Sequence, residues 1–207
     1  MAATTGLHRL RWTLYAPLYD ALVKLDRPRR RSIELLRLQP GERVLLIGAG
    51  TGADLPFLPA DLDVLATELT PAMLARAAGK RPGTRLEVMD GQCLALPDAA
   101  FDAVILHLIL AIVPDPAACL REAARVLRPG GRITVFDKFL PDGAHPSLRR
   151  RLLNALTRAI GTDVNRRLGD ILAAAGSPLV VEHDEPALLG GVFRIVLLRK
   201  QATGERQ

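Results

Sequence analysis

The chain has 207 residues, 49% of them hydrophobic and 24% charged, with a formal net charge of +6 and a pI of about 10.0. This is an ordinary globular composition, and the two cysteines exclude a disulfide framework and a cysteine-based metal cluster. The longest apolar run, residues 103–113, falls short of the ~20 residues that a membrane span needs, so we expect one domain (residues 1–207) in the cytoplasm.

The basic residues are unevenly distributed along the chain. Residues 9–31 and 138–167 together hold 14 of the 28 lysines and arginines, and each segment contains only two acids. Clustering of this kind favours an anionic partner such as a lipid surface or a nucleic acid. Two solvated helix faces are the alternative.

Residues 7–26 are predicted to form an amphipathic helix that Pro17 kinks or splits in two, and a second helix is predicted over residues 28–37. The only tryptophan and both tyrosines lie within residues 12–19. Tyr15 and Tyr19 are four positions apart and share a helix face. They either close over an acceptor molecule as part of a lid or dock the helix on the core. We assign residues 1–38 to this lid or membrane contact and residues 39–207 to the catalytic core.

Strands then alternate with helices. The expected strands are residues 43–47, 63–67, 85–89, 102–107, 131–136, 178–184 and 191–199, and the expected helices are residues 72–78, 116–127, 146–160 and 164–175. Thr70 is expected to cap the first of these helices, and Gly176 to end the last. This alternation predicts an α/β fold, a three-layer, Rossmann-like arrangement with a seven-stranded, mostly parallel sheet. The short connection at residues 185–190 predicts a C-terminal antiparallel hairpin at one edge.

A glycine-rich turn follows the first strand, and Glu68 closes the second. This pairing of a bare-backbone turn with a carboxylate is typical of a site for a nucleoside cofactor. The letters also fit a dinucleotide site, but Asp54 places an anion where a pyrophosphate would need a helix N-terminus. Pro56 and Pro59 leave little room for a full helix there. A ligand with a cationic sulfonium, such as S-adenosylmethionine, is compatible with Asp54.

Five segments in order, residues 44–52, 68, 90–92, 96–104 and 127–132, resemble the motifs of the class I S-adenosylmethionine-dependent methyltransferases. The resemblance implies that Glu68 binds both ribose hydroxyls and that Asp90 accepts a hydrogen bond from the adenine amine. Leu46 departs from the pattern, since the family usually has an acid two residues before the first glycine. The implied cofactor-binding residues are Gly48, Ala49, Gly50, Thr51, Gly52, Glu68, Leu69, Asp90, Gly91, Gln92, Leu106 and His107.

Residues 15–20, 29–36 and 136–141 resemble the small bacterial phospholipid N-methyltransferases of the Rhodobacter type, which convert phosphatidylethanolamine stepwise to phosphatidylcholine. On this resemblance Tyr15, Tyr19 and His107 shape the acceptor site. Lys138 would contact the lipid phosphate, with Arg149 and Arg150 as alternatives. The leucines and arginines of residues 146–160 suit an anionic membrane surface. We expect a monomer, peripherally bound to the inner membrane face, with no nucleic-acid partner.

Two other functions remain open from the sequence. The tyrosine-rich start is shared with methyltransferases of quinones and small molecules, so a soluble or quinone-like acceptor is an alternative. A non-catalytic RNA-binding protein would also use a basic surface. It is disfavoured because the chain lacks an aromatic platform on which bases stack.

Overall fold

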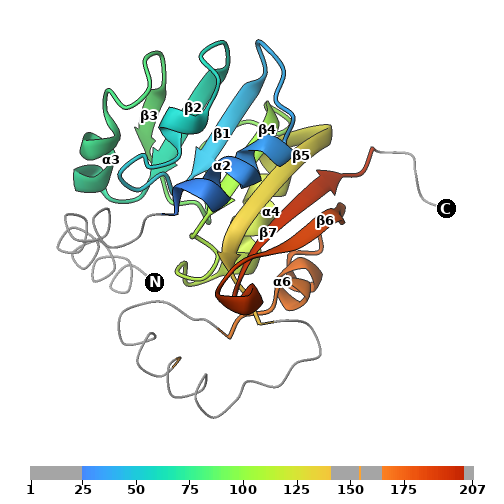
Figure 1. Ribbon diagram of the computed structural model, residues 1–207. Helices are drawn as coiled ribbons and strands as arrows, with labels where there is room; N and C mark the ends of the chain where they lie inside the picture. The colour runs from blue at the N-terminus through green and yellow to red at the C-terminus, as the bar shows by residue number, and fades with distance from the viewer. Residues whose placement is uncertain (1–24, 141–153, 155–164, 203–207) are drawn as a thin grey trace.

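The computed structural model describes residues 25–140, 154 and 165–202. Seven strands form one sheet in the order β3-β2-β1-β4-β5-β7-β6 (Figure 1). The predicted α/β fold is confirmed, and every predicted strand is present. The strands are β1 (Arg43–Ile47), β2 (Asp63–Glu68), β3 (Arg85–Val88), β4 (Phe101–His107), β5 (Leu127–Lys138), β6 (Leu179–Leu188) and β7 (Phe193–Lys200).

The first five strands are parallel, and β7 runs antiparallel to both β5 and β6. The C-terminal hairpin is therefore confirmed, although β6 extends through Leu188 and leaves only the short 3-10 helix η2 (Leu189–Gly191) as its turn. Because parallel strands end at a common edge, the last residues of β2, β4 and β5, which are Glu68, His107 and Lys138, lie at the same edge of the sheet. The ribbon in Figure 1 shows the sheet that carries this edge. Ligands bind at this edge in open α/β sheets.

Helices cover both faces of the sheet. On one face lie α2 (Asp26–Leu35), α3 (Pro71–Ala77) and the 3-10 helix η1 (Leu55–Phe57), where Ile33 and Ala77 share a core cluster with Leu46. On the other face α4 (Pro116–Val126) and α6 (Leu168–Ala175) pack against β4, all seven residues of which are buried. The single turn of η1 confirms that the chain has no full helix after the glycine turn.

Some local expectations have other outcomes. Thr70 precedes α3, but its side chain makes no capping hydrogen bond. At α4, Asp115 does cap the helix, because its side chain accepts a hydrogen bond from the Ala118 N–H at 2.9 Å. Gly176 ends α6 in the left-handed conformation, as predicted. The helices predicted at residues 7–26 and 146–160 fall almost wholly outside the described residues. Within the described part of the chain, no helix is long and apolar enough to cross a bilayer.

An ion pair fastens α2 to the edge strand β6. Arg31 donates two hydrogen bonds to the Glu185 carboxylate, at 2.9 and 3.1 Å. These bonds lower the pKa of Glu185 from 4.5 to about 2, with His183 adding a further hydrogen bond. A carboxylate with a depressed folded-state pKa stabilises the fold above its ordinary pKa and loses that contribution as pH falls toward the folded value.

We therefore expect Glu185→Gln to lower the melting temperature at pH 6, with the difference from wild type shrinking between pH 4.5 and pH 2. Thermal unfolding monitored by circular dichroism across this range measures it. Arg31→Met should show the same pH dependence because it removes the other partner. A difference that stays constant down to pH 2 would contradict this account.

Candidate cofactor site

The turn after β1 requires glycine for both its conformation and its space. Gly48, Gly50 and Gly52 have φ angles of +72°, +55° and +78°, in the left-handed region that other residues avoid. A Cβ on Gly48 would overlap the Cδ1 of Ile109, and one on Gly52 would lie 2.7 Å from the Cβ of Ala77. The backbone of this turn is therefore in close contact with the surrounding side chains.

Gly48→Ala should destabilise the protein by about 1–3 kcal/mol more than Gly41→Ala. Gly41 is the matched control because its φ is +79° but a Cβ added to it would meet no atom within 4 Å. Both variants carry the same backbone strain, so the difference between their free energies of unfolding in urea measures the overlap with Ile109. Adding Ile109→Val to Gly48→Ala removes the overlapping methyl and should recover part of the loss; equal unfolding energies for Gly48→Ala and Gly41→Ala would contradict this explanation.

Glu68 is held in a fixed orientation beside this turn. Its Oε2 accepts a hydrogen bond from the Gly50 N–H at 3.0 Å, and its Oε1 accepts one from the Thr70 N–H at 2.9 Å. Each carboxylate oxygen has further acceptor capacity, and Glu68 lines an open cleft. The arrangement suits a ligand with two adjacent hydroxyl groups, as in a ribose.

Asp90 fixes the opposite end of the cleft. Its Oδ1 accepts hydrogen bonds from the backbone N–H and the side-chain amide of Gln92, both at 2.9 Å. Gln92 in turn accepts a hydrogen bond from the Asp115 N–H at 2.8 Å. Among the described residues no group donates to the Asp90 Oδ2, so this oxygen can accept from a ligand amine.

The cleft lies between the glycine turn, the ends of β2 and β3, and the segment after β4. Six predicted residues line it, namely Gly48, Glu68, Leu69, Asp90, Gly91 and Gln92. Its other lining residues, which the sequence analysis missed, are Thr70, Met89, Ile109, Ile112, Val113 and Pro114. The sequence does contain a signal for some of these residues, since its apolar run continues past the end of β4. The apolar residues beyond the strand line the cleft, where they would flank a flat aromatic ring.

Ile109, Ile112 and Val113 form an apolar wall of the cleft, and two polar side chains hold the segment that carries it in place. The buried Asp137 accepts a hydrogen bond from the Ala111 N–H at 2.9 Å, and Arg166 donates to the carbonyl oxygens of Leu110 and Val113. Burial raises the pKa of Asp137 despite the opposing charge of Lys138 and the backbone hydrogen bonds that it accepts. Arg166 was counted among the basic residues of a binding surface, but its guanidinium binds these carbonyls instead.

Two predicted cofactor contacts are buried away from the cleft. Leu106 is fully buried in the core on the α4 side of the sheet. The His107 side chain is also fully buried, with its Nδ1 2.7 Å from the Asp54 Oδ1 and its Nε2 2.9 Å from the Ser32 Oγ. Neither residue lines the cleft. A contact of His107 with the acceptor stays a prediction, and in the structure both of its ring nitrogens have partners in the interior.

Asp54 also has a different role from the one expected. Its carboxylate is buried, and its Oδ2 lies 2.6 Å from the Nη1 of Arg29. Burial alone would raise the pKa of Asp54, but the charges and hydrogen bonds of His107 and Arg29 outweigh it and hold this pKa well below its usual range. Asp54 therefore neutralises an internal arginine and gives no reason to prefer a cationic ligand.

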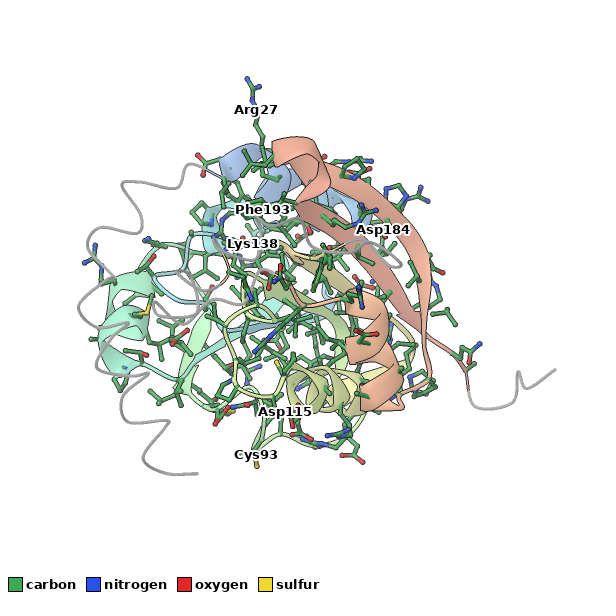
Figure 2. The ribbon with its side chains drawn as sticks, turned by 90° about the horizontal axis from the view of Figure 1, so that it is seen from below. Arg27, Cys93, Asp115, Lys138, Asp184 and Phe193 are labelled. Carbon is green, nitrogen blue, oxygen red and sulfur yellow. The ribbon has the colours of Figure 1, made fainter. Side chains whose placement is uncertain are left out.

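The remaining candidates fall partly inside and partly outside the described residues. Lys138 lies beside Phe193 at the carboxyl edge of the sheet, with its Nζ 5.3 Å from the ring centroid (Figure 2). Ala49, Gly50, Thr51 and Gly52 form the turn next to the cleft. Tyr15, Tyr19, Arg149 and Arg150 lie outside the described residues.

Comparison with known proteins agrees with this geometry. Residues 45–135 match the family described as "Methyltransferase domain", and the match covers the glycine turn, Glu68 and Asp90. The chain is a class I S-adenosylmethionine-dependent methyltransferase. The fold of this chain is similar to that of geranyl diphosphate C-methyltransferase from Streptomyces coelicolor, which was solved with S-adenosylhomocysteine. The TM-score is 0.68 and the sequence identity 16%, and the match covers 86% of this chain and 77% of that enzyme.

Two curated relatives of this methyltransferase differ in acceptor. Phosphatidylethanolamine N-methyltransferase from Cereibacter sphaeroides is 28% identical over 197 residues, 92% of this chain and 95% of the relative. Demethylmenaquinone methyltransferase from Corynebacterium efficiens is 40% identical over 114 residues, 55% of this chain. That match spans only 49% of the relative's own length.

The cofactor of this methyltransferase is S-adenosylmethionine. The residues present fit it: Glu68 offers a pre-oriented carboxylate to the ribose, Asp90 a free oxygen to the adenine amine, and Ile109 an apolar surface to the ring. Gly48 of the glycine turn also lines the cleft.

Proposed function

We propose that this methyltransferase transfers methyl groups to the amine of phosphatidylethanolamine and its partly methylated products, ending at phosphatidylcholine. The observation that carries the proposal is the extent of similarity to the Cereibacter enzyme, which runs over 92% of this chain and 95% of that enzyme. The quinone-methylating relative is matched over only about half of its length. Residues outside the shared cofactor domain are the ones that recognise an acceptor, so similarity over the whole chain bears more on the substrate.

The residues of the cleft perform the binding part of the reaction. When bound, S-adenosylmethionine supplies a methyl group activated by its positively charged sulfur. Glu68 and Asp90 fix the nucleoside at both ends, and the apolar wall at Ile109, Ile112 and Val113 excludes water from the ring. Because methyl transfer is an in-line displacement, holding the two reactants in line is the main contribution that a protein makes.

Lys138 is our candidate for the lipid phosphate. It ends β5 at the edge where the parallel strands terminate, and its ammonium lies against Phe193 with no carboxylate bonded to it among the described residues. A phosphate oxygen would complete its hydrogen bonding. Tyr15, Tyr19, Arg149 and Arg150 remain proposed acceptor-site residues in the segments that the structure leaves undescribed.

The protein's charge supports a site at an anionic membrane surface, such as the inner membrane face. Its net charge is +6, and although Arg29 and Arg166 are used internally, residues such as Arg27 point away from the body of the protein (Figure 2). Basic residues near an anionic surface each contribute about 1 kcal/mol of attraction.

A quinone acceptor is the second candidate, because identity is higher, at 40%, over the part that the demethylmenaquinone methyltransferase shares. One expression experiment distinguishes the two. The host is a bacterium that contains phosphatidylethanolamine and demethylmenaquinone but lacks phosphatidylcholine and its own quinone methyltransferase. We expect mono-, di- and trimethylated phosphatidylethanolamine in the lipid extract by mass spectrometry. Unchanged phospholipids together with conversion of demethylmenaquinone to menaquinone would overturn the proposal in favour of the quinone acceptor. Glu68→Ala is the inactive control.

A further inference from the structure

A chain of buried polar side chains runs behind the cofactor cleft. Arg29 binds one oxygen of Asp54 at 2.6 Å, and the other oxygen lies 2.7 Å from the His107 Nδ1. The His107 Nε2 lies 2.9 Å from the Ser32 Oγ, which lies 2.6 Å from the Thr134 Oγ1. All five residues are at most 7% exposed, and none of them lines the cleft.

The central contact in this row of polar side chains joins the two segments that bound the cleft. Asp54 comes two residues after Gly52 and is therefore attached to the end of the glycine turn. His107 is the last residue of β4 and precedes the segment that carries Ile109. The hydrogen bond between Asp54 and His107 therefore adds a side-chain tie between the end of the turn and the end of β4, beyond the backbone pairing of β1 with β4 that ends at Ile47 and Leu106.

Burying these charges is costly, since apolar residues of similar volume often replace a buried ion pair at no loss of stability or with a gain. Stability alone therefore does not account for three ionisable groups at this place. The neighbouring strand offers no polar substitute, because Leu46, where related enzymes carry an acid before the glycines, is fully buried among apolar side chains. Polar support for the turn comes from Asp54 behind it.

We propose that Asp54 and His107 are positioning residues for S-adenosylmethionine. Their hydrogen bond holds the glycine turn and the Ile109 wall at the separation that the cofactor needs, and Arg29 ties this bond to α2. The inference concerns the cofactor alone and does not depend on which acceptor is methylated.

Two substitutions of His107 separate positioning from simple packing. In His107→Asn the amide nitrogen takes the place of Nδ1 and still donates to Asp54. In His107→Gln it takes the place of Nε2 and reaches only Ser32. We expect the dissociation constant of S-adenosylhomocysteine, measured by calorimetry, to stay within about threefold of wild type for His107→Asn and to rise about tenfold for His107→Gln, a loss of about 1.4 kcal/mol.

Ser32→Ala is the matched control, because it removes the bond to Nε2 and leaves the Asp54–His107 bond in place. It should lower the melting temperature without changing the dissociation constant. Equal dissociation constants for the two His107 variants would overturn the proposal and leave the chain of polar side chains a purely structural feature.

A second pair of variants tests the same bond without leaving an unpaired buried charge. Arg29→Met combined with Asp54→Asn keeps an oxygen that accepts from His107, whereas Arg29→Met with Asp54→Leu does not. Both are full-length proteins with a neutral residue 54. The Asn form should bind S-adenosylhomocysteine about tenfold more tightly than the Leu form, and equal binding would overturn the proposal.

Discussion

Glu68→Ala is expected to weaken S-adenosylhomocysteine binding by at least about 100-fold. A hydrogen bond to a charged group contributes about 1.5–3 kcal/mol, and Glu68 is placed to make two with the ribose, so about 3 kcal/mol or more is lost. The substitution also frees the N–H groups of Gly50 and Thr70, which now hold the carboxylate. Isothermal titration calorimetry measures the change directly.

The control for this prediction is Glu87→Ala, which removes an exposed carboxylate from β3. It should bind the ligand as wild type does. Glu68→Gln should resemble Glu68→Ala, because its amide would point a donor at one of the two backbone N–H groups. Binding within about threefold of wild type for Glu68→Ala would show that the nucleoside lies elsewhere.

Arg29→Met is expected to have the largest effect on stability, lowering the free energy of unfolding by about 3 kcal/mol. Removing one partner of a buried ion pair leaves an incompletely compensated charge, which typically costs about 3–5 kcal/mol, and here His107 still binds Asp54. Because the pKa of Asp54 is held below its ordinary 3.8, the ion pair stabilises the fold above that pH. The difference from wild type should shrink as acid protonates Asp54.

Urea unfolding at pH 7 tests this prediction, with Arg27→Met as the control. Arg27 lies on the same helix, is exposed and points away from the protein, so its loss should change stability by less than about 0.5 kcal/mol (Figure 2). Adding Asp54→Asn to Arg29→Met should restore part of the loss by removing the uncompensated charge. A cost below about 1 kcal/mol for Arg29→Met would mean that Asp54 is neutralised in another way.

The sequence was sufficient to predict the elements whose cause is local. The alternation of apolar strands with helices predicted the sheet, and the short C-terminal connection predicted its antiparallel edge. Gly48 and Glu68 were found because their roles depend on a strand, a turn and the end of the next strand, all close together in the chain.

The contacts of Asp54 and His107 that the sequence did not predict join residues far apart along the chain. Asp54 was interpreted from its neighbours, yet its partners are Arg29, 25 positions earlier, and His107, 53 positions later. His107 ends a strand at the ligand-binding edge, but nothing in a sequence shows which face of a doubly covered strand a side chain takes. The apolar wall at Ile109, Ile112 and Val113 could not be predicted, because an apolar run in a sequence does not show which of its residues end a strand and which line a cleft.

The most direct test of the central claim uses the purified full-length protein, S-adenosylmethionine with a labelled methyl group, and vesicles of phosphatidylethanolamine mixed with an anionic phospholipid. We expect label in mono-, di- and trimethylated phosphatidylethanolamine, separated by chromatography, and no label with Glu68→Ala. Wild-type protein that binds S-adenosylhomocysteine but leaves these lipids unlabelled would contradict the phospholipid assignment while leaving the cofactor site intact.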